Sequence, residues 1–151
     1  MFGYANGATV KNLTVDGYII GSQSIGGIFG NAWYCTAEDC VNKADMVGAQ
    51  SYIGGIAGYS ANSSFIRCTN YGKITSEGGQ VGGIAGRASG TFRTCSNYGD
   101  VTLSNSPGSI TNKRYGGIVG SIEGGSRLVN CLNYGNITAY ISAGGLIGYE
   151  E

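Results

Sequence analysis

The sequence predicts an all-β fold, a right-handed parallel β-helix (β-solenoid) of about five coils of ~28 residues. Three observations predict it. A motif of the form GG-[IL]-x-G recurs five times along 151 residues, glycine reaches 29 residues while proline occurs once, and no long stretch spaces its apolar residues as a helix would. Many tight turns between short strands explain such a composition. Right-handed winding is the usual rule for parallel crossover connections.

Two motifs alternate along the chain. The first glycines of GG-[IL]-x-G stand at positions 26, 54, 82, 116 and 144, so the spacings are 28, 28, 34 and 28 residues. A C-x-N motif lies between them and begins at Cys40, Cys68, Cys95 and Cys131. A single coil cannot bury its apolar face, whereas stacked coils pair strand to strand about 4.8 Å apart and share one core. Propeller blades need roughly 40 residues, so this period favours a solenoid.

Within one coil the sequence predicts three strands in order. The first is GGIAG at 54–58, where glycine lets neighbouring backbones approach closely. The second is FIRCTN at 65–70, whose alternation places Ile66, Cys68 and Asn70 on the inner face. The third is the short KIT at 73–75, after the turn NYG.

Two copies depart from this pattern. Residues 10–20, VKNLTVDGYII, read as a degenerate first copy, and we expect Asn12 at its cysteine position. In the third copy the cysteine follows the motif glycines one residue sooner than in the second, which predicts a shift or bulge in that coil.

Stacking turns equivalent residues into columns. We expect the four cysteines to form an inward ladder of free thiols, because the chain has no histidine and no CxxC pair for a metal knuckle or an activated nucleophile. Asparagines that follow each cysteine by two residues can bond amide to amide at the turn: Asn42, Asn70, Asn97 and Asn133. The glycine motif lacks the lysine and the helix of a phosphate-binding loop. The sequence therefore predicts no catalytic residue, no cofactor and no metal.

The first candidate ligand surface is an outward column of tyrosines, Tyr71, Tyr98 and Tyr134, with Lys43 at its foot. Aromatic rings on a rigid surface suit the stacking of sugar rings, and this is the functional interpretation. The alternative is that each ring only covers its turn and packs on the ring of the next coil. Both interpretations place the rings outside the core.

The second candidate surface is the insertion at 103–114 in the long coil, which ends in the cationic pair Lys113 and Arg114. Insertions in repeat proteins form loops on one face and often supply the binding element. The alternative is a surface insertion that the fold merely tolerates.

Charged residues also align between coils. Asp45, Lys73 and Asp100 share one position, and Asp39 lies beside Arg67, so the sequence predicts pairing of opposite charges on adjacent coils. A glycosidase needs two carboxylates that face one another in a groove. We expect no such pair in the outward columns.

The two motifs together resemble the GLUG-type repeats of bacterial secreted and cell-surface proteins, and the resemblance covers nearly the whole chain. The resemblance implies that the chain is a segment of a large extracellular, adhesin-like protein. It does not imply a catalytic role for any residue of this sequence. Since the chain starts and stops within a repeat, we expect residues 1–151 to be one solenoid segment of a larger protein. The formal net charge of +0 does not indicate the basic surface that binds nucleic acid. No apolar run in the sequence is long enough to span a membrane.

These observations predict a non-catalytic stalk or binding surface, extracellular or at the cell surface. The expected partners are glycans, host or cell-surface proteins, and flanking modules of the same polypeptide. The alternative is the β-helix domain of a polysaccharide-acting enzyme, a lyase or a glycoside hydrolase.

Overall fold

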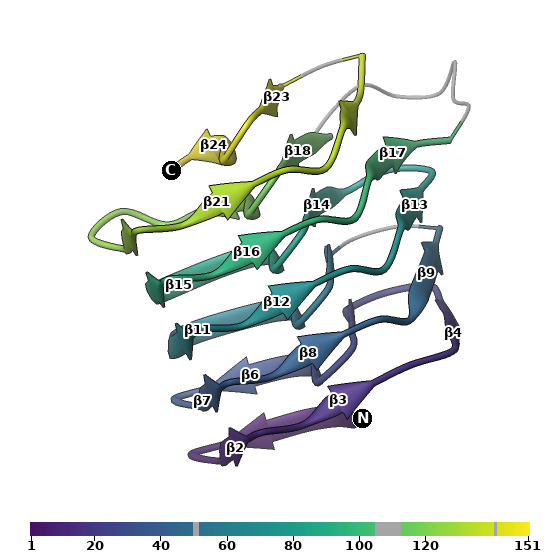
Figure 1. Cartoon of the computed structure of the whole chain (residues 1–151). Helices are drawn as coiled ribbons and strands as arrows, with labels where there is room; N and C mark the ends of the chain where they lie inside the picture. Colours follow the sequence, from purple (N-terminus) through teal and green to yellow (C-terminus); the bar gives the residue numbers. More distant parts are fainter. Residues whose placement is uncertain (50–51, 105–112, 141) are drawn as a thin grey trace.

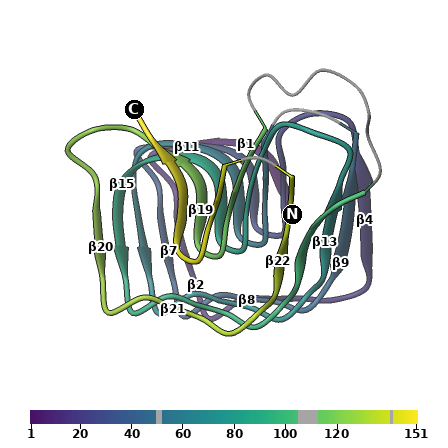
Figure 2. The same cartoon turned by 90° about the horizontal axis from the view of Figure 1, so that it is seen from above.

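A computed structural model describes residues 1–49, 52–104, 113–140 and 142–151. Short parallel strands wind in stacked coils that climb from the N-terminus to the C-terminus (Figure 1), and the described residues contain no helix. Seen from above, the chain runs anticlockwise as it climbs toward the viewer (Figure 2), so the winding is right-handed. The prediction of a right-handed parallel β-solenoid of about five coils is confirmed.

The largest sheet has nine strands and forms one broad face and an adjoining side of the solenoid. Its central path is β1 (Phe2–Asn6), β6 (Phe29–Trp33), β11 (Ala57–Ile66), β15 (Ala85–Arg93), β19 (Val119–Ile122) and β24 (Ile147–Glu150). Three shorter strands extend it along the side: β2 (Thr9–Lys11), β7 (Thr36–Glu38) and β20 (Arg127–Val129).

Three five-stranded sheets complete each coil. One contains β3 (Thr14–Val15), β8 (Val41–Asn42), β12 (Thr69–Asn70), β16 (Ser96–Asn97) and β21 (Leu132–Asn133). The next contains β4 (Tyr18–Gly21), β9 (Asp45–Gly48), β13 (Ile74–Ser76), β17 (Val101–Leu103) and β22 (Ile137–Thr138). The last contains β5 (Ile25–Gly26), β10 (Tyr52–Gly54), β14 (Gln80–Gly82), β18 (Arg114–Gly116) and β23 (Ala143–Gly144).

The glycine motif is a bend between two strands, and the prediction that GGIAG forms one strand is wrong. In the coil of Cys68, β10 ends at Gly54 and β11 begins at Ala57, and residues 55 and 56 turn the chain. We call this position the glycine bend; in Figure 2 it points into the middle of the cross-section. Glycine is needed because a Cβ on Gly54 would lie 2.2 Å from the Ala57 carbonyl oxygen.

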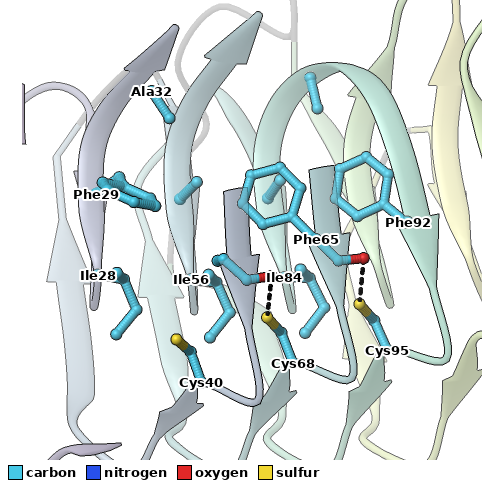
Figure 3. Packing of buried hydrophobic residues seen from close by; sticks show 14 of the residues in the cluster. Ile28, Phe29, Ala32, Cys40, Ile56, Phe65, Cys68, Ile84, Phe92 and Cys95 are labelled. Carbon is cyan, nitrogen blue, oxygen red and sulfur yellow. Dashed lines mark hydrogen bonds between the residues drawn. The ribbon is translucent and has the colours of Figure 1, made fainter. Parts of the chain in front are cut away.

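The bend divides the interior into two separate apolar clusters. The larger holds the ladder Ile28, Ile56 and Ile84 together with stacked Phe65 and Phe92, whose ring centroids are 4.8 Å apart (Figure 3). The smaller is built on the other side from Ile25, Met46, Ile53, Ile74, Val81, Val101, Leu103 and Tyr115. Each coil therefore contributes side chains to two narrow cores rather than to one wide core.

FIRCTN is broken by a corner, and the prediction of one continuous strand is wrong. β11 ends at Ile66, Arg67 takes a left-handed backbone with φ of 50°, and β12 begins at Thr69. The corner shifts the alternation, so Phe65 rather than Ile66 joins Cys68 inside. Equivalent corners in the other coils are also left-handed: Asn12, Asp39, Thr94 and Asn130.

The pairing of strands between successive coils contradicts one prediction from the sequence and confirms another. Leu13, not Asn12, occupies the cysteine position of the first coil, because Val41 bonds to its carbonyl as Thr69 bonds to that of Cys40. The shift predicted before Cys95 is present: Ser60 pairs with Ala88 but Ser63 pairs with Gly90, so the coil of Cys68 holds one residue more than the coil of Cys95 at this point.

Candidate functional site

The asparagine ladder predicted from the C-x-N motif is confirmed. Each Nδ2 donates 2.8 Å to the Oδ1 of the next asparagine, from Asn42 to Asn70, Asn97 and Asn133. The second Nδ2 hydrogen of Asn70 donates to the Gly72 carbonyl at 2.9 Å, so both of its amide donors are bonded. Asn42, Asn70 and Asn97 are fully buried. The ladder is a polar spine between the two apolar clusters, where an unpaired amide would be costly.

The inward thiol ladder is also confirmed. All five cysteines are free, and all except Cys131 are buried. Each ladder thiol donates to a carbonyl of the coil below, as from Cys68 to Ala37 and from Cys95 to Phe65, both at 3.4 Å (Figure 3). The pKa of the Cys95 thiol is raised, because the neighbouring thiol groups and burial disfavour its thiolate. The buried thiols therefore pack as small apolar side chains inside the stack.

The tyrosine column stands on the outer surface as predicted. Tyr71 and Tyr98 stack with ring centroids 5.0 Å apart and planes 13° apart, and Tyr98 and Tyr134 stack at 4.8 Å and 10°. The three side chains are 53%, 46% and 62% exposed. Nearly parallel rings at this spacing cover one another's faces, so the column presents mainly ring edges and hydroxyl groups to solvent.

Within the predicted insertion, residues 105–112 lie outside the described residues. Its last two residues, Lys113 and Arg114, are described, and neither projects into open solvent. Lys113 is 7% exposed. The Arg114 guanidinium lies 3.8 Å over the Tyr149 ring and pairs with Glu151 at 2.5 Å. Arg114 therefore belongs to a contact network with the last strand, β24.

That network lies on a face that sequence reasoning missed. Because the chain turns back at the glycine bend, outward residues of β10, β14 and β18 meet those of β11, β15, β19 and β24 outside the core; we call this surface the re-entrant face. Tyr52 contacts Tyr59 across it, with ring centroids 5.5 Å apart, and Arg114 donates to the Ser121 hydroxyl at 3.1 Å. Trp33 extends the aromatic contact, with its ring centroid 5.7 Å from Tyr59.

The re-entrant face also holds two carboxylates that share one arginine, a pairing that lies outside the columns considered from the sequence. Arg87 pairs with Glu123 at 3.3 Å and with Glu151 at 2.7 Å. Both acids follow the last glycine of their GG-[IL]-x-G motif by three residues, a signal that the sequence contained. The bond from Arg114, followed by the charge of Arg87, holds the pKa of Glu151 below its usual value.

The charge pairs predicted between coils form only in part. Arg67 pairs with Asp39 at 2.7 Å, as predicted, and also with Glu38 at 2.6 Å, a pair that was not predicted. Asp45, however, accepts a hydrogen bond from the backbone N–H of Lys73 at 2.8 Å, so it binds the amide rather than the ammonium group. Asp100 likewise accepts from the backbone N–H of Asn136 at 2.9 Å.

A cavity of about 350 Å³ opens at the edge of the first coil. It is lined by Met1–Gly3, residues 19–26, Gly30 and Asn31, beside the outer edges of β1, β4 and β5. Among the described residues, no group of three or more Cys, Asp or Glu side chains is placed to hold a metal ion.

Comparison of the chain with protein-family models, curated proteins and solved structures found no match. No helix in the described part of the chain is long and apolar enough to cross a membrane.

Proposed function

We propose that the chain is a non-catalytic, rigid repeat segment of a bacterial secreted or cell-surface protein and presents its outer surface to glycans or proteins. The observation that carries this proposal is the asparagine ladder, bonded without a break from Asn42 to Asn133. Its members are separated by one coil each, so the bonds tie successive coils together along the axis. A body tied in this way suits a stalk or a display surface.

The resemblance to GLUG-type repeats supports the extracellular part of the proposal. Two motifs carry that resemblance, and they form the glycine bend and the asparagine ladder. These two elements contact one another inside each coil. Exposed aromatic residues on two separate faces, Tyr98 and Trp33 among them, support a binding role, because rigid aromatic side chains supply contact area at little entropic cost.

The second candidate is a polysaccharide-acting enzyme, and Glu123 and Glu151 at Arg87 favour it. A glycoside hydrolase needs one carboxylic acid that keeps its proton near neutral pH, which requires a raised pKa. Arginine or lysine partners lower the pKa of three carboxyl groups, those of Glu38, Asp39 and Glu151. These partners favour the structural role of the acids.

The test is to incubate the purified chain with a panel of insoluble and soluble polysaccharides, measuring both retention of protein and release of soluble sugar. We expect retention on at least one polysaccharide and no released product. Release of reducing ends or unsaturated sugars that disappears in Glu123→Gln would overturn the proposal in favour of the enzyme. Tyr98→Ala, compared with Tyr98→Phe, measures the part of the retention that the tyrosine column supplies.

A further inference from the structure

We propose that Trp33, Tyr59 and Tyr52 on the re-entrant face form a platform that binds a neutral glycan. This inference rests on glycan binding within the proposed function, and it assigns that binding to a different surface from the tyrosine column. The three residues project from β6, β11 and β10, and each makes an aromatic contact with another member.

The angles between the rings distinguish the platform from the tyrosine column. Trp33 and Tyr59 are tilted by 48°, and Tyr52 and Tyr59 by 42°. Tilted rings leave part of each face uncovered, whereas the stacked rings of the column, 10° to 13° apart, cover each other. A sugar ring needs an open aromatic face to pack on. The platform offers such faces, and Trp33 is 37% exposed.

Hydrogen-bonding groups lie on both sides of the platform along the solenoid axis. Asn31 occupies the position equivalent to Tyr59 on the neighbouring strand of the coil below, and Arg87 occupies it on the neighbouring strand of the coil above. Gln80 lies next to Tyr52 in its column, is 6% exposed, and its Oε1 has no hydrogen-bond partner. Amide and guanidinium groups beside an aromatic surface suit the hydroxyl groups of a sugar.

The charges of the re-entrant face favour a neutral ligand. Arg87 is paired with Glu123 and Glu151, and Arg114 with Glu151, so each guanidinium already has a carboxylate partner. An anionic sugar would have to displace one of these carboxylates. A neutral glycan needs no such exchange, and the guanidinium N–H groups keep donors for its hydroxyl oxygens.

The experiment uses Trp33 as its own reporter, because the chain has one tryptophan. The chain is titrated with neutral oligosaccharides of glucose, mannose, galactose and xylose, and with an oligouronate as the anionic probe. Trp33 emission and calorimetric heat are followed together. We expect a saturable emission change with a neutral probe. Tyr59→Ala should weaken binding about tenfold, and Tyr59→Phe and Tyr98→Ala should leave it within about twofold.

The outcomes separate this inference from the proposed function. One outcome is that a neutral sugar releases heat without changing Trp33 emission and binds the Tyr98→Ala variant more weakly. This result would overturn the platform and leave the proposed function standing. Emission changes with the oligouronate alone overturn the neutral class. Absence of binding by any probe overturns both the platform and the glycan role. The unfolding midpoint of Tyr59→Ala is measured alongside, and an equal loss of affinity in Tyr59→Phe would also count against a ring platform.

Discussion

Gly55 lies directly against the side-chain amide of Asn70. A Cβ placed on Gly55 would be 2.4 Å from Asn70 Cγ and 2.5 Å from its Oδ1. The same contact recurs in the neighbouring coils, between Gly27 and Asn42 and between Gly83 and Asn97. The two recurring motifs of each repeat are therefore the two sides of one contact, and this contact lies between the two apolar clusters.

Gly55→Ala is predicted to destabilise the fold by about 2 to 3 kcal/mol, since the methyl group has no room and the asparagine cannot retreat without breaking the ladder. Chemical denaturation measures the effect. Gly3→Ala is the matched control, because a Cβ there meets nothing within 4 Å, and it should change stability by less than about 0.5 kcal/mol. Equal effects in the two variants would contradict the contact.

Asn70→Asp should cost roughly 3 kcal/mol or more at neutral pH. The change removes both amide donors and leaves the Gly72 carbonyl and the Asn97 Oδ1 facing a buried carboxylate. Burial raises the folded-state pKa of the new carboxyl, so the loss should shrink as pH falls and the group is protonated. Urea unfolding of both chains at several pH values between neutral and about 4 tests this. A pH-independent difference would contradict it.

The period of 28 residues was sufficient to predict the solenoid, because register in a coil stack follows directly from equivalent positions such as Asn70 and Asn97. It was not sufficient to place the bends. Strict alternation put Ile66 inside, whereas the left-handed corner at Arg67 reverses the alternation, and a backbone angle of this kind leaves little trace in residue type. Asparagine and aspartate at the equivalent corners, as in Asn12 and Asp39, were the available signal.

The candidate site was predicted less completely. The tyrosine column follows from one recurring position, so Tyr98 could be placed outside from sequence alone. The re-entrant face joins positions of different type on two strands, Tyr52 before the glycine bend and Tyr59 after it. Their contact depends on the chain turning back at the bend, and interpreting GGIAG as a single strand hid it.

Tyr98→Ala is predicted to lower stability by about 1 to 3 kcal/mol, because Tyr98 is the central ring and stacks on both Tyr71 and Tyr134. Tyr98→Phe keeps both stacks and should be close to neutral. Thermal unfolding compares the variants. Equal stability of the alanine and phenylalanine variants would show that the column does not stabilise the outer turn.

The ion pairs of Arg67 with Glu38 and Asp39 should make the free energy of unfolding depend on pH in the acid range. The bonds of Arg67 lower the pKa of Asp39, and those of Lys11 and Arg67 lower the pKa of Glu38. A lowered folded-state pKa contributes stability that is present above the ordinary values of 3.8 and 4.5 and is lost as pH falls further. Arg67→Gln should therefore be less stable than the parent at pH 7, and the difference should vanish in acid and diminish in high salt. An undiminished difference in acid would contradict this.

The thiol ladder predicts an order of chemical labelling. Cys131 is the last member and is partly exposed, whereas Cys40, Cys68 and Cys95 are buried beneath neighbouring coils. Alkylation under native conditions requires an accessible thiolate, so Cys131 should react first and the three inner thiols only when the stack opens. Mass spectrometry after timed exposure to iodoacetamide gives the order directly. In denaturant all five cysteines should react at similar rates, and native labelling of Cys68 before Cys131 would show that the ladder opens from within its middle coils.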